Sequence, residues 1–359
     1  MRKCEVCGMK QSKKRFLNNL ITYGMVVIAF IICQVMIQNG NMTRSFKGQL
    51  VPICVYIVMA VSLNLTVGIS GELSLGHAGF MSIGAFSGIV ASTWLLNSFN
   101  MENEVVRLLL SMIFGGCIAG IAGVLIGIPV LRLRGDYLAI VTLAFGEIIR
   151  NVLNCLYFSV DGKRIYVSFN DPDLPGKIFV NGPAGATGIT KIATFGMGFA
   201  LVLFTLFVVL NLINSRTGRA IMATRDNRIA AESVGIAVTK YKMIAFVVSA
   251  VLAGMAGALY GLNASTTVAS KFKFDTSILV LVFVVLGGIG NIRGSVIAAA
   301  LLTVLPELLR AFADYRMLVY AIVLIIVMLI RNSTAIKQWR SSVSEKRKNK
   351  KVKTGEGSV

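Results

Sequence analysis

The amino-acid sequence predicts an all-α polytopic membrane protein with about ten transmembrane helices, glycine-broken segments and both termini in the cytoplasm. Of its 359 residues, 55% are apolar and 14% are charged. A soluble domain of this length could not cover so much apolar surface, whereas lipid needs no cover. Apolar runs long enough to cross a bilayer alternate with short polar segments, and the basic residues gather in alternate segments.

The transmembrane domain is expected at residues 20–331, between a basic N-terminal tail (1–19) and a basic C-terminal tail (332–359). The first run lacks a small-residue cleavage site, so we interpret it as a retained span rather than a signal peptide. The short run 277–290 is interpreted as a broken crossing, because irregular backbone is tolerated where it lines a protein-enclosed cavity. The predicted spans are 20–38, 50–69, 77–97, 105–130, 136–157, 193–213, 243–262, 277–290, 294–311 and 317–330.

The placement of Lys and Arg orients these spans. With the N-terminus inside, the inner segments hold most of the 36 basic residues, and the reversed topology would place that excess outside. Segment 215–242 then faces the cytosol, and segment 158–192 forms one sizeable outer loop. The turn signals of this loop indicate a small docking surface rather than a domain. They are Asp171-Pro172-Asp173, Pro175-Gly176 and Asn181-Gly182-Pro183.

Several function classes are excluded by what the chain contains. The net charge of +20 could suggest nucleic acid, but no basic stretch is interleaved with aromatic residues on a soluble module. The chain has a single histidine, and Cys4 and Cys7 form half a zinc knuckle with no second pair in a cytosolic segment, so no metal site is predicted. The sequence contains no P-loop and no Ser-His-Asp ordering. Nucleotide binding and catalysis by this chain are therefore not expected.

A glycine-rich stretch, VGISGELSLGHAGFMSIGA at 67–85, lies at membrane level. Glycine permits backbone conformations that other residues block, so the stretch predicts a broken helix along a solute pathway, where freed amides could meet a carboxylate. Small-residue helix packing is the alternative, since it uses the same glycines and serines. His77 is interpreted as a hydrogen-bonded structural residue rather than a titrating switch. The pathway candidates here are Gly71, Ser74, Gly76, His77 and Gly79.

The next span begins with LRLRGDYLAIVTL at 131–143. Asp136 is expected to cap its helix and to oppose the positive N-terminal dipole. Thr142 and Glu147 lie deeper and are further pathway candidates, because ionisable groups inside a membrane are commonly functional. Glu147 has Arg150 three residues later, so an ion pair and a pathway role both stay open for it.

The polar segment 215–242 is too long and too charged to serve merely as a connection between two helices. Its middle, 227–234, is predicted to form a short surface helix on which Ile229, Ala230 and Val234 share a face. A cytosolic partner could seat that helix. A solvated basic connection is the alternative, and it explains the charges but not the compact IAAESVG core at 229–235.

Four motifs together resemble LivM-type permeases, the membrane subunits of bacterial ABC importers for branched-chain amino acids. The resemblance covers about 50–331 in order and without large gaps, and both tails fall outside it. The motifs are LSLGHAGFMSIGAF at 73–86, RLRGDYLAIVTLAFGEIIR at 132–150, GRAIMATRDNRIAAESVGIAVTKYKMIAFVVSAVLAGMAGALYG at 218–261 and FVVLGGIGNIRGSVIAA at 283–299.

The resemblance implies an importer in the bacterial cell membrane that moves Leu, Ile or Val into the cytosol. The implied partners are two cytosolic ATPase subunits, a second related permease, an extracytoplasmic solute-binding protein and membrane lipid. ATP and Mg would be bound by the ATPase subunits, with no cofactor in this chain. Arg228 stands where such coupling loops often carry an acidic residue. The implied coupling-loop residues are Asp226, Ala230, Ala231, Glu232 and Gly235.

Two alternatives stay open. The same architecture could import urea, short amides or other amino acids, because a loosely lined pathway leaves selectivity largely to the binding protein. An ion-coupled secondary transporter working alone would need intramembrane carboxylates, for which Glu147 and Glu307 are the candidates. A membrane enzyme fits less well than either.

Overall fold

The structure is a computed structural model that describes residues 2–39, 43–99, 101–133, 135–161, 164–169, 175–309 and a few positions between 315 and 329. The chain divides into two compact units, Met1–Thr303 and Val304–Val359. The arrangement described below is that of the first unit.

Helices occupy the first nine predicted spans, while the tenth, 317–330, lies largely outside the described residues. Six of the described helices are long and apolar enough to cross a membrane, and α10 is a shorter apolar helix. The helices are α1 (Arg2–Gln38), α2 (Arg44–Asn64), the π-helix η1 (Leu65–Ser70), α3 (His77–Phe99), α4 (Glu104–Val130), α5 (Asp136–Asn154), α6 (Phe195–Asn214), α7 (Arg216–Asp226), α8 (Arg228–Ser233), α9 (Val238–Gly261), the short 3₁₀-helix η3 (Ala269–Phe272), α10 (Phe274–Gly287) and α11 (Ile292–Leu308).

Helices α3, α4 and α9 pack most closely and form the centre of the unit. Small residues bring their backbones into contact, as interfaces between membrane helices require. A Cβ atom at Gly84 would overlap the carbonyl oxygen of Gly254, and one at Gly257 would overlap that of Met81. These glycines therefore serve helix packing.

The glycine-rich stretch at 67–85 interrupts the helix, as the sequence predicts. Helix α2 ends in η1, Gly71 takes a φ of +77°, and residues 71–76 are not helical before α3 begins at His77. The Nε2 atom of His77 lies 2.8 Å from the Oγ atom of Ser62. Along the helix, Ser62 lies about 12 Å before Ser70. The chain after Gly71 therefore runs back alongside α2 into the protein. We call residues 65–76 the broken segment.

A five-stranded antiparallel sheet follows α5, and the prediction of an all-α fold is wrong here. The sheet has the order β2-β1-β3-β4-β5, and Leu156 to Asp161 pair with Phe169 to Arg164. Both β1 and β2 are rich in aromatic and β-branched residues, which favour strands. Turns do occur at Pro175-Gly176 and at Gly182, where η2 (Gly182–Ala184) begins. The strands are β1 (Leu156–Asp161), β2 (Arg164–Phe169), β3 (Lys177–Asn181), β4 (Ala186–Thr187) and β5 (Thr266–Thr267).

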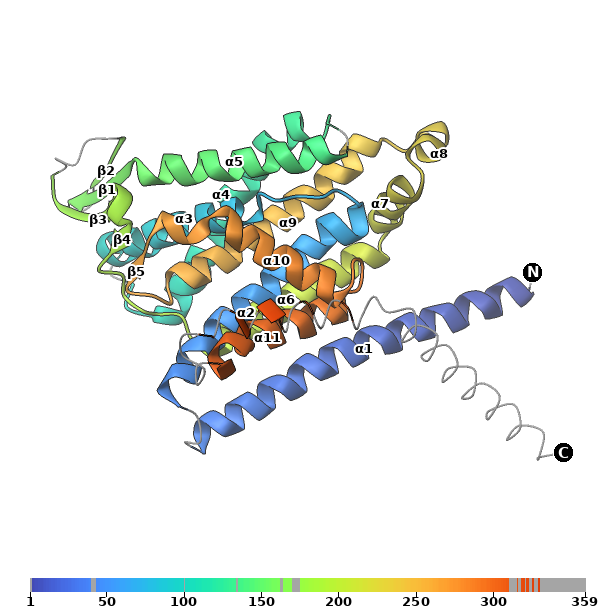
Figure 1. Ribbon diagram of the computed structural model, residues 1–359, viewed down its shortest axis with the longest axis horizontal. Helices are drawn as coiled ribbons and strands as arrows, with labels where there is room; N and C mark the ends of the chain where they lie inside the picture. The colour runs from blue at the N-terminus through green and yellow to red at the C-terminus, as the bar shows by residue number, and fades with distance from the viewer. Residues whose placement is uncertain are drawn as a thin grey trace. The chain divides into compact units, whose positions relative to one another are not determined.

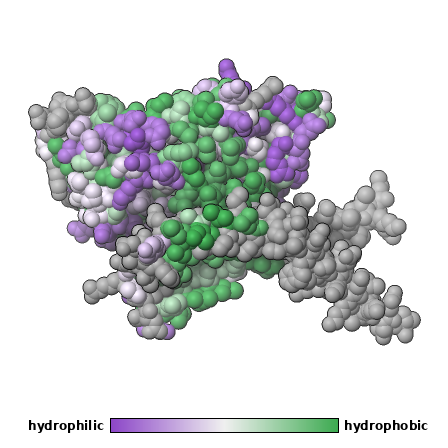
Figure 2. Space-filling view, viewed as in Figure 1, coloured by the Kyte–Doolittle hydropathy of each residue, from purple (hydrophilic) through white to green (hydrophobic). Residues whose placement is uncertain are grey.

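The sheet lies at one end of the helical body, and α7 and α8 lie at the other (Figure 1). Figure 2 shows hydrophobic surface between hydrophilic surfaces at these two ends. Exposed apolar side chains on α4 and α5 contribute to this apolar surface, as lipid contact requires. They include Leu109, Ile113, Leu125, Ile140, Ile148 and Val152.

Candidate functional site

Four of the seven predicted pathway residues, Gly76, Gly79, Thr142 and Glu147, lie where the start of α3 meets α5 and the start of α10. A cavity of about 10 Å³ lies between these elements, which is room for about one water molecule. Gly79 and Glu147 line it together with residues that the sequence did not single out. Those are Leu75, Ala78, Leu143, Gly146, Phe272, Lys273, Phe274 and Ser277.

Hydroxyl groups satisfy the backbone amides that the break in the helix leaves free. The backbone N–H of Leu75 donates to Thr142 Oγ1 at 3.0 Å, and that of Ala78 donates to Ser277 Oγ at 3.1 Å. A Cβ atom at Gly76 would overlap the Thr142 carbonyl oxygen, so glycine allows the segment to approach α5. The structure thus brings Gly76, Gly79 and Thr142 together at one junction.

Glu147 both lines the cavity and forms an ion pair. Its Oε2 atom accepts a hydrogen bond from Arg150 Nε at 2.7 Å, and the two side chains are 33% and 22% exposed, respectively. Glu147 can therefore both form the ion pair and line the candidate pathway, the two roles that the sequence left open for it. Asp136 is the first residue of α5 but Gly135 is its N-cap, and no side chain caps the helix. The expected cap by Asp136 is thus wrong, although its charge still lies in the first turn, beside the positive end of the helix dipole.

The other three pathway candidates, Gly71, Ser74 and His77, lie away from this junction. His77 is 2% exposed and faces Ser62 on α2, while Gly71 lies against the side chain of Arg225 on α7. Ser74 is 2% exposed, and its hydroxyl finds no partner among the described residues. The candidate pathway group is therefore smaller than the sequence pattern suggested.

Helix α8 forms within the predicted range 227–234. The Asn227 side chain caps it by accepting from the Ala230 backbone N–H at 3.1 Å. Arg228 Nε donates to Glu232 Oε1 at 3.0 Å across one turn. Ile229 and Val234 are 80% and 77% exposed, which presents two large apolar side chains outward.

The end of α8 is fixed by its backbone. Gly235 takes a φ of +80°, its N–H donates to the Glu232 carbonyl, and the Ile236 N–H donates to the Ala231 carbonyl. This is the Schellman arrangement that glycine favours after a helix. Ala231 is 3% exposed, so this predicted docking residue faces inward rather than outward.

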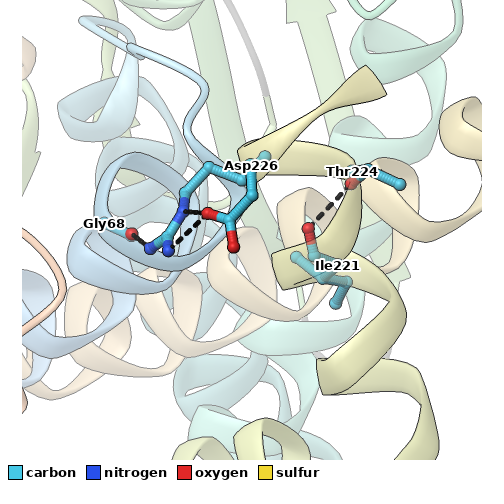
Figure 3. Close-up of polar contacts among 5 residues, drawn as sticks. Gly68, Ile221, Thr224 and Asp226 are labelled. Atoms are coloured by element: carbon cyan, nitrogen blue, oxygen red, sulfur yellow. Dashed lines mark hydrogen bonds and ion pairs between the residues drawn. The ribbon is translucent and has the colours of Figure 1, made fainter. Parts of the chain in front are cut away.

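Arg225 is a contact residue that sequence reasoning missed. Its Nη1 donates to the Gly68 carbonyl oxygen of η1 at 2.9 Å, and its Nε and Nη2 donate to Asp226 Oδ1 at 3.0 and 2.8 Å (Figure 3). Asp226, which was predicted as a coupling residue, therefore orients Arg225. No local pattern marks a contact between residues 157 positions apart.

Asn64 was also missed, and it joins α2 to the turn between α10 and α11. Its Oδ1 accepts from the Gly290 N–H at 2.8 Å, and its Nδ2 donates to Ser295 Oγ at 2.9 Å. Asn64 is fully buried. An asparagine in the middle of an apolar run is the signal that could have found it, since polar groups there are expected to bond across helices.

The sequence of the chain matches a known protein family over most of its length. Residues 45–328 match the family described as "Branched-chain amino acid transport system / permease component". The chain belongs to this family. Together with its apolar helices, membership identifies a multi-pass protein of the bacterial inner membrane, as predicted. The family description is that of a transport component rather than of an enzyme.

Three relatives place the chain within this family. It is 35% identical over 311 residues to the high-affinity branched-chain amino acid transport system permease protein LivM of Salmonella typhimurium, a match covering 77% of this chain and 66% of the relative. It is 34% identical to LivM of Escherichia coli, again covering 77% of this chain and 66% of the relative. The ribose import permease protein RbsC of E. coli is 28% identical, with 77% and 81% covered. The chain thus spans slightly less than two thirds of the length of both LivM relatives. No solved structure matches.

Proposed function

We propose that this chain is the membrane-spanning permease subunit of an ATP-binding-cassette importer that moves branched-chain amino acids into the cytosol. The observation that carries the proposal is α8, a short helix fixed at both ends that presents Ile229 and Val234 outward. Exposed apolar side chains on a charged segment are typical of a surface that a partner covers. Membership of a permease family supports the proposal.

The partner of α8 in this proposal is one of two cytosolic ATPase subunits. A second related permease and an extracytoplasmic solute-binding protein complete the assembly. ATP and Mg would be held by the ATPase subunits, whose closure pushes α8. Because α8 is in contact with both α7 and α9, a push on it reaches the helical body.

The solute would pass the junction of α3, α5 and α10. The first turns of α3 and α10 supply positive dipole ends, which suit a carboxylate, and Glu147 supplies a negative charge. With room for about one water molecule, the cavity is closed to an amino acid in this conformation, so transport needs helix movement. Selection among solutes would then lie largely with the binding protein.

Replacement of both outward apolar residues tests the docking proposal. The double variant Ile229→Asp with Val234→Asp keeps the cap and the Arg228–Glu232 pair but places carboxylates where an apolar contact is expected. We expect at least about a tenfold loss of ATPase co-purification and of labelled leucine uptake in proteoliposomes, the loss typical of truncating a central interface residue. Val167→Asp, at a 55% exposed position on β2, is the matched control for co-purification.

Two outcomes would contradict the proposal. Undiminished co-purification by the double variant would remove α8 as the docking element. Leucine uptake by the purified chain alone, driven by an ion gradient without ATPase subunits, would instead establish the secondary transporter.

A further inference from the structure

The end of the broken segment nearest α7 is held by a side chain from α7 itself. We propose that Arg225 is the positioning residue through which movement of α7 and α8 reaches the solute pathway. This inference rests on the proposed function, since it assigns to the docking element a connection to the cavity. It stands on the contacts of Arg225 with Gly68 on one side and Asp226 on the other (Figure 3).

Gly68 offers an acceptor because it lies in the last turn of η1. Carbonyl groups at the end of a helix lack the backbone donors that a continuing helix would supply. The guanidinium of Arg225 supplies one at 2.9 Å, and a cation is also favourable at the negative end of a helix dipole. Asp226 holds the guanidinium by two further hydrogen bonds, so its position follows that of α7.

The two glycines of this end make the contact possible. A Cβ atom at Gly71 would lie 2.6 Å from Cγ of Arg225, and the φ of +77° at Gly71 disfavours any other residue. A Cβ atom at Gly68 would overlap both Asn64 Oδ1 and the Gly290 backbone nitrogen. The backbone of η1 at Gly68 therefore touches both Arg225 and the α10–α11 turn.

Asn64 continues the connection toward the cavity. It bonds Gly290 and Ser295 next to η1, and α10 leads from this turn back to Ser277. Ser277 lines the cavity and holds the first turn of α3 through the Ala78 N–H. A contiguous series of contacts thus runs from α7 through η1 and α10 to the pathway, and such a series can carry coupling between two sites.

The broken segment itself is not locked by its own side chains. The hydroxyls of Ser70 and Ser74 are buried and find no partner among the described residues. A buried hydroxyl without a hydrogen bond costs free energy, so these two side chains do not stabilise the present arrangement. Contacts from outside, by Arg225 and by the Lys242–Glu72 ion pair, therefore hold the present arrangement.

The variant Arg225→Gln tests this role in the complete complex reconstituted with both ATPase subunits. Glutamine is too short to reach Gly68 O and carries no charge, while α8 and its outward face are unchanged. We expect ATPase co-purification and ATP hydrolysis near wild type, with about tenfold less labelled leucine moved per ATP, the loss expected for one charged hydrogen bond. Arg225→Lys, which keeps the charge, is expected to recover part of this ratio.

Arg219→Gln is the matched control, because it makes the same change on the same helix in a side chain that bonds only the Asn214 carbonyl among the described residues. Its leucine-to-ATP ratio is expected to stay at the wild-type value. A second reporter is hydrogen exchange of amides 65–76, which should become faster in Arg225→Gln and stay unchanged in the control. A merely structural role would lower folding yield without changing the ratio.

The proposal is overturned if Arg225→Gln moves as much leucine per ATP as the wild type. This outcome is distinct from failure of the proposed function, in which the wild-type complex itself would not couple uptake to ATP. If Arg225→Gln is poorly folded, Gly71→Ala displaces the same guanidinium without removing a charge. An unchanged leucine-to-ATP ratio in that variant would equally overturn the proposal.

Discussion

The centre of the helical unit and the broken segment are held together in opposite ways. Helices α3, α4 and α9 meet through small residues, and Gly84 and Gly254 bring two backbones into contact. The broken segment is held by a few polar side chains that reach it from other elements, chiefly Arg225, Thr142 and Lys242.

This difference makes α3, α4 and α9 the rigid part of the molecule, whereas the broken segment can exchange its hydrogen-bond partners. Close packing distributes its energy over many short contacts, all of which weaken when the helices separate by a fraction of an ångström. A hydrogen bond has one donor and one acceptor and can be exchanged for another of similar energy. The structure therefore assigns stability to α3, α4 and α9 and conformational change to residues 65–76.

The largest effect is expected from Gly84→Ala at the centre. The added methyl group would overlap the Gly254 carbonyl oxygen, which is backbone and cannot rotate away. We expect destabilisation of about 3 kcal/mol, at the upper end of overpacking, measured as a lower thermal inactivation midpoint of the detergent-solubilised protein. Most of the variant should fail to reach the membrane in folded form.

Gly196→Ala on α6 is the control for this prediction, since no atom lies within 4 Å of a Cβ atom at Gly196. It should be neutral or stabilise slightly, because alanine is the better helix former. Equal inactivation midpoints for the two variants would show that close backbone contact does not hold the centre together.

A smaller effect is expected from Asn64→Ala at the border between the two regions. The change removes the bonds to Gly290 and Ser295 and leaves the Gly290 N–H without its acceptor. The expected loss of stability is about 1–2 kcal/mol, given the modest worth of polar contacts between membrane helices. Thermal inactivation again measures it, and the leucine-to-ATP ratio should fall as in Arg225→Gln.

Asn214→Ala is the matched control, because the Asn214 side chain bonds only its own helix among the described residues, through the Leu210 carbonyl at 2.7 Å. Its inactivation midpoint should lie closer to wild type than that of Asn64→Ala. Equal inactivation midpoints for Asn64→Ala and Asn214→Ala would show that Asn64 does not join the two regions. The proposed series of contacts from η1 to α10 would then be wrong.

The sequence predicted the features that local chemistry determines. Run length predicted the helices of the first nine spans, the glycines around Gly71 predicted the break, and the shared face of Ile229, Ala230 and Val234 predicted α8. Each signal lies within a few residues of the structure it specifies.

Other features depend on partners far away in the chain and have no local signal. Arg225 meets Gly68, and Ser277 meets Ala78, across 157 and 199 positions, respectively. Strand β5 follows α9 and joins the sheet only because β4 offers it an edge. The sheet as a whole was missed because its strands are short and lie between charged and turn residues, and their pairing joins residues from both sides of α9.

The smallest effect is expected from His77→Gln at the start of α3. The Ser62 hydroxyl donates to the Met59 carbonyl at 3.0 Å, so its oxygen is free to accept from His77 Nε2–H at 2.8 Å. A glutamine amide can donate to the same oxygen, so leucine uptake should stay within about twofold of wild type, with a parallel profile between about pH 5.5 and 8. His77→Leu keeps the burial but loses the bond, and should lower stability by about 1 kcal/mol. A flatter pH profile of leucine uptake in His77→Gln than in the wild type would show that His77 is a titrating switch. The region that changes conformation would then extend into α3.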